Sequence, residues 1–244
     1  LMMNENNKPV FLNKAPSLDR FFRISKALKE MSLTRYLQYE LIKSYSFKGH
    51  VLDFGGGDKA RYSSLLKCQS YKSVNIDPII TPTWVIDINE VLPCADKSFD
   101  SVISFNTLEH IYDVSSALKE MKRVLKSDGE LFLITPFLYP IHGHPDDFFR
   151  PTGSWYKETL NKLGFQKIEV ISLSWGPFST GQTCSGVPGK FKRFRQKIAL
   201  LLDLLYFNFL MHIKSKPLDL QQFSQQHATS FVVRATKKNE GSQI

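Results

Sequence analysis

A short apolar segment that ends in an acid and three glycines constrains the fold most strongly. Residues 51–57 read Val-Leu-Asp-Phe-Gly-Gly-Gly, and we expect a helix to begin near Lys59. A strand, a tight glycine turn and a helix N-terminus together form a cradle for a nucleotide-like ligand. A second apolar segment, residues 74–77, ends in Asp77. A carboxylate at that position can accept both ribose hydroxyls of a nucleoside, so the two segments predict a nucleotide-type site.

Further strands follow at regular intervals along the chain. Residues 84–87 end in Asp87, and residues 98–105 precede the sequence Asn-Thr-Leu-Glu-His-Ile at 106–111. Segments that alternate between strand and helix patterns, as they do here to about residue 135, indicate a parallel, doubly wound α/β sheet. The remaining predicted strands cover residues 130–135, 167–173 and 227–235.

The order of these motifs resembles the class I S-adenosylmethionine-dependent methyltransferases, in particular their small-molecule branch of the methyltransferase type 11 kind. The pattern D-x-x-x-x-L-P-x-x-x-x-S-F-D-x-V begins at Asp87, and L-E-H-I begins at Leu108. The resemblance covers about residues 35–175. It implies a Rossmann-like, seven-stranded, mostly parallel sheet with one antiparallel strand. It also implies that S-adenosylmethionine binds at the carboxyl ends of strands one to four.

The resemblance assigns the first cofactor contacts to the glycine turn. Asp53, Gly55 and Gly57 match the family's first motif, in which the turn lets the backbone approach the methionine part of the ligand. The chain departs from the family at Lys59, where a third small residue is usual. That side chain either leans into solvent or crowds the site, and the second case would give a relative that binds the cofactor without turnover.

The resemblance assigns the remaining cofactor contacts to the next three strand ends. Asp77 matches the acid that binds the ribose, Asp87 and Ile88 match the positions that meet adenine, and Asn106 matches the strand-four end beside the ligand.

An insertion at residues 137–152 leaves the fifth strand at the ligand edge and carries the predicted catalytic residues. Methyl transfer to a hydroxyl requires a positioned acceptor and a base that removes its proton. The candidates for catalysis are His144, His142 and Asp146. Arg150 is predicted to hold a substrate carboxylate or phosphate through two parallel hydrogen bonds, and His110 is a further candidate for substrate contact. Histidine and aspartate are also metal-ligand types, but we predict no metal.

A second insertion, residues 174–226, combines a basic block with an apolar stripe at helical spacing. The basic residues are Lys190, Lys192, Arg193, Arg195 and Lys197. The stripe, within residues 190–213, includes Phe194, Ile198, Leu201, Leu205 and Phe209. The apolar part is too short to span a bilayer. Three interpretations remain open: a surface that meets anionic lipid, a lid or homodimer contact, or packing against its own domain.

These observations predict a helical cap at residues 1–45 and a methyltransferase domain at residues 46–244, interrupted by the two insertions. The net charge of +9 favours an anionic partner. Three scattered cysteines suggest reduced thiols and a cytoplasmic protein, with peripheral binding to the inner membrane face as an extension. The predicted function is methyl transfer to oxygen of a small-molecule, sugar or lipid-linked acceptor. The His-rich loop loosely resembles methyltransferases of bacterial surface-polysaccharide synthesis. The alternatives are an RNA methyltransferase, which lacks support from an Asn-Pro-Pro-aromatic motif at residue 106, and a non-catalytic S-adenosylmethionine-binding protein.

Overall fold

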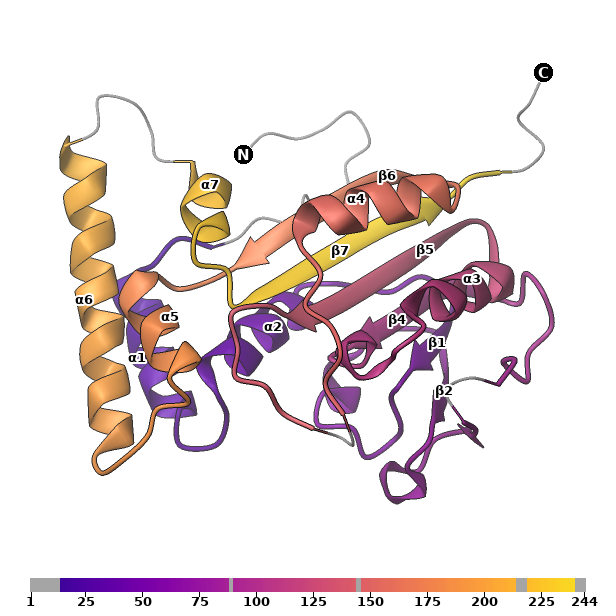
Figure 1. The fold of residues 1–244 in the computed structure, drawn as a ribbon, viewed down its shortest axis with the longest axis horizontal. Coiled ribbons are helices and arrows are strands. Elements are labelled where there is room, and N and C mark those ends of the chain that lie inside the picture. The colour runs from indigo at the N-terminus through magenta and orange to yellow at the C-terminus, as the bar shows by residue number, and fades with distance from the viewer. Residues whose placement is uncertain (1–13, 88–89, 144–145, 214–218, 240–244) are drawn as a thin grey trace.

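The computed structural model describes residues 14–87, 90–143, 146–213 and 219–239 (Figure 1). One seven-stranded sheet runs through the molecule in the order β3-β2-β1-β4-β5-β7-β6. The strands are β1 His50–Phe54, β2 Ser70–Asn75, β3 Trp84–Val85, β4 Phe99–Phe105, β5 Leu125–Pro136, β6 Phe165–Leu173 and β7 Ser230–Lys237. The strands from β3 to β5 pair in parallel, and β7 is antiparallel to both β5 and β6. The predicted fold class is confirmed.

The strand order reverses between β1 and β4, because the chain moves outward from β1 to β3 and then returns to the other side of β1. At such a switch point the loops after neighbouring strands diverge to opposite faces, and this opens a ligand site at the carboxyl edge of the sheet. The glycine turn and the segment after β4 both begin at this edge.

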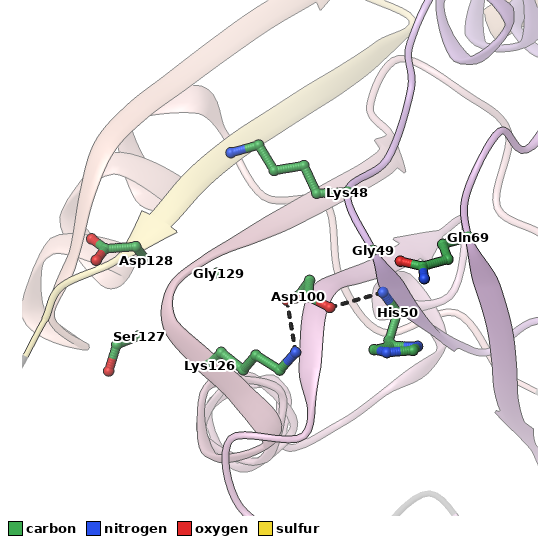
Figure 2. A pocket seen from close by; sticks show the side chains of 9 residues that line it. All are labelled: Lys48, Gly49, His50, Gln69, Asp100, Lys126, Ser127, Asp128 and Gly129. Carbon is green, nitrogen blue, oxygen red and sulfur yellow. Dashed lines mark hydrogen bonds and ion pairs between the residues drawn. The ribbon is translucent and has the colours of Figure 1, made fainter.

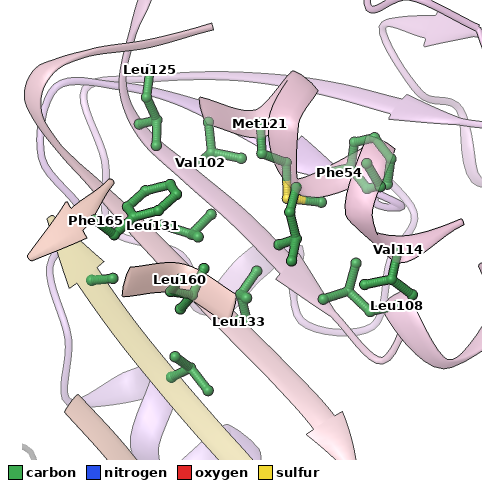
Figure 3. Packing of buried hydrophobic residues seen from close by; sticks show 14 of the residues in the cluster. Phe54, Val102, Leu108, Val114, Met121, Leu125, Leu131, Leu133, Leu160 and Phe165 are labelled. Carbon is green, nitrogen blue, oxygen red and sulfur yellow. The ribbon is translucent and has the colours of Figure 1, made fainter. Parts of the chain in front are cut away.

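Helices cover both faces of the sheet and enclose two apolar cores (Figure 1). They are α1 Leu18–Ala27, α2 Leu33–Lys43, α3 Val114–Val124, α4 Gly153–Lys162, α5 Pro177–Cys184, α6 Lys192–Ile213 and α7 Leu220–Gln225. Figure 3 shows the core under α3 and α4, where Leu131 and Leu133 of β5 meet Met121 and Leu160. These side chains are fully buried. Because successive strand residues point to opposite faces, Phe132 joins the other core.

The N-terminal helices α1 and α2 belong to that second core. Ser17 and Ser32 cap them, each accepting a hydrogen bond from the backbone N–H three residues on. Ile24 and Leu37 are buried together with Ile103 and Phe132 of the sheet. The two helices therefore share a core with the sheet.

The helix expected from Lys59 is absent, because the residues after the glycine turn bond to another loop. The N–H groups of Asp58 and Lys59 donate to the carbonyls of Thr81 and Ile80, at 3.2 and 3.1 Å. Only a short 3₁₀ turn, η1 Ser63–Leu65, follows. The predicted helix was wrong. The local sequence of a helix start looks the same as that of a turn whose N–H groups bond to a loop elsewhere in the chain, here the loop after β2.

The second insertion forms α5, α6 and α7 at one end of the sheet (Figure 1). Its long helix α6 packs against α5 and α1. The sequence suggested that the apolar part of this segment is too short to span a bilayer, but α6 as a whole is long and apolar enough to do so by length and composition, and 28% of its most apolar part is buried.

Candidate active site

The glycine turn after β1 is tightly packed against its own chain. Gly55 has φ +95°, a conformation that side chains disfavour. A Cβ at Gly56 would lie 1.8 Å from Oδ2 of Asp53, and one at Gly57 would lie 2.3 Å from the carbonyl oxygen of Ile80. The glycines therefore allow the loops after β1 and β2 to touch at the carboxyl edge.

Asp53 supports this turn from beneath. Its side chain is fully buried. The carboxylate Oδ2 accepts hydrogen bonds from the hydroxyls of Tyr62 and Tyr71, at 2.9 and 2.7 Å. Burial raises the pKa of Asp53 to about 7, although the two tyrosine hydroxyls act in the opposite direction. The structure thus directs this predicted cofactor residue into the protein, where it fixes the turn.

Asp77 lies just beyond the carboxyl end of β2 and is half-buried. Its Oδ1 accepts the N–H of Ile79 at 2.8 Å, which starts the 3₁₀ turn η2 Pro78–Ile80. Within the described parts of the chain, Oδ2 of Asp77 has no hydrogen-bond partner. Asp87 follows β3 at the same edge, whereas Ile88 lies outside the described residues. Lys59 is exposed, so its side chain leans into solvent.

Asn106 stands at the end of β4 with φ +51°. Its side-chain amide exchanges two hydrogen bonds with the amide of Gln38 in α2, at 2.9 and 3.0 Å. The predicted cofactor residue therefore anchors the cap helix to the strand-four turn.

The segment after Asn106 carries a buried acid next to a histidine. Leu108–His110 form the 3₁₀ turn η3. Glu109 is fully buried. Neither of its carboxylate oxygens has a hydrogen-bond partner among the described residues. Burial raises the pKa of Glu109 to about 8.

Two histidines meet this acid from different segments. Nε2 of His110 lies 3.7 Å from Oε1 of Glu109. The ring of His142, from the first insertion, is 5.2 Å from the ring of His110 between centroids. Glu109 was not among the site residues predicted from the sequence. The signal that would have identified it is an acid–histidine pair directly after the strand whose carboxyl end borders the ligand edge.

The first insertion holds its own charges in place. The guanidinium of Arg150 forms a two-pronged ion pair with the carboxylate of Asp147. Oδ2 of Asp147 also accepts the N–H of His142 at 3.0 Å. Burial raises the pKa of Asp147, but the hydrogen bonds and charges of Arg150 and His142 together outweigh it and keep that pKa below its ordinary value. Arg150, which was predicted to bind substrate, instead forms an ion pair with Asp147 of its own loop.

The other predicted catalytic residues are placed less completely. Asp146 is exposed, and its backbone carbonyl lies 2.5 Å from Nδ1 of His110. His144 lies outside the described residues. The structure therefore brings His142 and His110 together, with Glu109 as the acid of the group.

Comparisons with known proteins place relatives of this chain among the methyltransferases. Residues 52–133 match the family model described as a methyltransferase domain. The uncharacterized protein YafE of Escherichia coli is 45% identical over 85 residues, which are 34% of this chain and 40% of YafE. A tRNA U34 carboxymethyltransferase of Campylobacter lari is 24% identical over 203 residues, covering 70% of this chain and 68% of that protein. An S-adenosylmethionine-dependent methyltransferase from Thermotoga maritima superposes with a TM-score of 0.52 at 17% identity, over 90% and 94% of the two chains.

The chain carries a class I S-adenosylmethionine-dependent methyltransferase domain. The part of this chain that matches YafE spans two fifths of the length of that protein. The cofactor of the methyltransferase domain is S-adenosylmethionine, and the residues present fit it. The carboxylate of Asp77 keeps an oxygen available at the end of β2, where ribose hydroxyls would donate. The close-packed glycines leave the turn without side chains at the same edge.

A basic cavity lies beside the loop after β5. It measures about 370 Å³ and lies between the α1–α2 loop, the loop after β5 and the start of α6. Its basic lining residues are Lys29, Arg35, Arg61, Lys192 and Arg193, and its lining acid among the described residues is Glu30. Tyr139 also lines it, and the Tyr139 ring lies 5.3 Å from the His142 ring between centroids.

A second cavity lies at the opposite edge of the sheet (Figure 2). It measures about 390 Å³ and adjoins the starts of β1 and β4. Oδ2 of Asp100 accepts the N–H of His50 at 2.9 Å, and Oδ1 pairs with Lys126 at 2.8 Å. Because ligands of doubly wound sheets bind at the carboxyl ends of the strands, this amino-edge cavity is not where we expect the cofactor.

Proposed function

We propose that this domain transfers the methyl group of S-adenosylmethionine to a hydroxyl oxygen of a small acceptor that carries a negative charge. Sugars and lipid-linked molecules are the acceptor classes that fit. The observation that carries the proposal is the group formed by Glu109, His110 and His142 at the carboxyl end of β4. This group holds proton-accepting side chains at the sheet edge where we expect the cofactor to bind.

Methyl transfer to a hydroxyl requires one bond to form, one bond to break and one proton to leave. The acceptor oxygen forms a bond to the methyl carbon, the carbon–sulfur bond breaks, and a neutral thioether leaves. The hydroxyl proton must pass to a base or to water, and a positioned base contributes about 10²–10⁴-fold. The imidazole of His142 is half-buried on a loop, and we take it as the base. His144 and Asp146 remain the other predicted candidates.

The basic cavity supports an anionic acceptor. Five cationic side chains around about 370 Å³ would attract a phosphate or carboxylate, and arginine binds such groups through parallel hydrogen bonds. The same charge would also attract RNA, which is the second candidate because a relative from Campylobacter lari acts on tRNA by its name.

Transfer of the labelled methyl group from S-adenosylmethionine to separate pools of nucleotide sugars, lipid extracts and RNA tests the proposal. We expect label in a small-molecule or lipid pool, with kcat reduced in His142→Ala and His144→Ala and unchanged in His212→Ala, a change on α6. Label in RNA alone would support the nucleic-acid alternative. Cofactor binding without transfer to any pool would support a non-catalytic protein.

We further propose that α6 lies on an anionic lipid surface. Phe194, Leu205 and Phe209 are 64%, 57% and 59% exposed, while Leu200 and Leu204 on the opposite side of α6 are buried. The helix thus has one apolar side in its own core and a second apolar side toward solvent. A basic block at its first turns complements anionic headgroups, and each basic residue near such a surface contributes about 1 kcal/mol.

Co-sedimentation with anionic and neutral vesicles tests this surface. We expect salt-sensitive binding to anionic vesicles, and loss of that binding when Lys192 and Arg195 are changed to Glu. Changing Lys157 and Lys162 of α4 to Glu serves as the control with the same charge change. Absence of binding by the parent at low salt would overturn the lipid proposal, and concentration-dependent self-association would then favour a homodimer through α6.

A further inference from the structure

We propose that Glu109, His110 and His142 bind a divalent transition-metal cation beside the cofactor edge. One ligand atom from each residue lies within 4.8 Å of the others. Metal–ligand distances of about 2.0–2.2 Å are required for nitrogen and oxygen donors. The three side chains are therefore near enough to close around an ion with small rotations. They come from two segments, η3 and the first insertion, that meet at the end of β4.

The buried carboxylate of Glu109 is the observation that points to a ligand. It is fully buried, and both oxygens lack a hydrogen-bond partner among the described residues. An ionised carboxylate in such surroundings is costly unless a cation or hydrogen-bond donors compensate it. A bound cation compensates it directly, because both oxygens can then serve as ligands.

The histidines show the second arrangement expected of metal ligands. Nδ1 of His110 lies 2.5 Å from the carbonyl oxygen of Asp146, and Nδ1 of His142 lies 3.2 Å from the carbonyl oxygen of Pro140. A histidine that binds metal commonly donates its other ring N–H to a backbone carbonyl, which fixes the ring and its tautomer. A proton on Nδ1 leaves the lone pair on Nε2. Nε2 of His110 already faces Oε1 of Glu109 at 3.7 Å.

The neighbouring charges permit a cation. Arg150 is the nearby positive side chain that acts on Glu109. Its guanidinium is paired with Asp147, whose side chain is 3% exposed, so the two charges largely cancel. Asp147 itself also lies 3.4 Å from Nδ1 of His142 and adds negative charge behind that ring.

The ligand set favours certain ions and leaves room for the acceptor. Two imidazoles and one carboxylate suit Zn²⁺, Mn²⁺ or Fe²⁺ better than Mg²⁺ or Ca²⁺, which prefer oxygen ligands. Three protein ligands leave a coordination position open, as in metal sites that act on substrates.

At that position the cation would hold the acceptor hydroxyl and lower its pKa, and the proton would pass to water before the oxygen attacks the methyl carbon. This role, unlike the binding site itself, rests on the proposed methyl transfer. His142 would then act as a metal ligand, in place of its predicted role as a base.

Metal binding can be measured without any acceptor. The purified full chain is stripped with EDTA and dialysed, and binding of Zn²⁺ and of Mn²⁺ is measured by equilibrium dialysis with elemental analysis. We expect one ion per chain at the tight site. Glu109→Gln keeps the size of the side chain, and His142→Ala alters a half-buried loop residue. Each change should weaken binding at least about 10–100-fold. His50→Ala, which removes an exposed histidine at the opposite edge, should leave it unchanged.

Calorimetry with S-adenosylmethionine on the same four proteins separates this proposal from the methyl-transfer proposal. We expect cofactor affinity to be retained in the metal-site variants, whose folding is checked by circular dichroism. If Glu109→Gln fails to fold, His142→Ala decides alone. A parent that takes up no ion, or that binds it no more tightly than His142→Ala does, would overturn the metal site whatever the outcome for the cofactor.

Discussion

Gln38 in α2 and Asn106 at the end of β4 exchange two hydrogen bonds, at 2.9 and 3.0 Å. The amide nitrogen of Gln38 also donates to Oγ of Ser230 in β7 at 3.0 Å. Gln38 is 2% exposed. One side chain thus ties the N-terminal cap to the turn that carries the ligand edge and to the last strand. Cap and site are mechanically linked at this point.

Gln38→Ala should lower the free energy of unfolding by about 1–3 kcal/mol, because it leaves the half-buried amide of Asn106 without its partner side chain. It should also weaken cofactor binding, since the turn after β4 loses its tether. Urea unfolding and calorimetry with S-adenosylmethionine measure the two effects. Gln222→Ala, an exposed change on α7, is the control. Equal stability of parent and Gln38→Ala would show that the exchange contributes nothing.

Asp77→Ala should weaken binding of S-adenosylmethionine by about 2–3 kcal/mol, because the ribose hydroxyls lose a charged acceptor. The fold should persist, since Asp77 is half-buried and its structural bond is one local contact to Ile79. Calorimetry measures the change, and Asp19→Ala on the surface of α1 is the control. Binding by Asp77→Ala as tight as that of the parent would refute the assignment of Asp77 as the ribose acid.

Asp203→Ala should destabilise the second insertion. Asp203 of α6 is fully buried, and its two oxygens accept the N–H groups of Phe178 and Ser179 at 2.8 Å each. It therefore caps α5, whose own N-cap residue, Gly176, provides no side-chain bond. Leaving these donors unpaired should cost about 1–3 kcal/mol.

Hydrogen exchange of the amides of α5 should accelerate in Asp203→Ala and stay near the parent rate in Asp203→Asn, which retains one acceptor oxygen. Unchanged exchange in both variants would contradict the capping role.

Glu130 should make the protein lose stability in acid. Its carboxylate accepts the hydroxyl of Tyr45 at 2.6 Å and pairs with Arg234 at 2.7 Å. Burial raises the pKa of Glu130, but these contacts prevail and lower it from 4.5 to about 2. Because the folded pKa lies below the unfolded value, the stabilisation is present above about pH 4.5 and is lost as the pH falls through about 2. A shift of this size corresponds to about 3 kcal/mol at most.

Glu130→Gln should therefore be less stable than the parent at pH 7 and should lose less stability between pH 4.5 and 2. Urea unfolding at several pH values measures how the free energy of unfolding of each protein changes with pH. Parallel slopes for the two proteins would mean that Glu130 titrates at its ordinary value when folded.

The sequence was sufficient for the sheet and for the cofactor edge. Apolar strands that end in Asp53, Asp77 and Asp87 are local patterns, and the parallel topology follows from strands that alternate with helices. An N-cap hydrogen bond spans three residues, so the caps at Ser17 and Ser32 likewise depend on sequence neighbours. These features could be read from the chain because the interactions that form them lie between sequence neighbours.

Only the tertiary structure decided where polar groups find their partners. The donors of Asp58 and Lys59 are captured by the loop after β2, which prevents a helix there. Asp147 forms an ion pair with Arg150. Asp203 of α6 caps α5. Glu109 becomes a buried acid beside His142 because a loop after β5 folds back onto the end of β4. Apart from the Asp147–Arg150 pair, which joins residues three apart in one loop, these outcomes depend on the distance between segments that are remote in sequence, and the packing of the cores sets that distance.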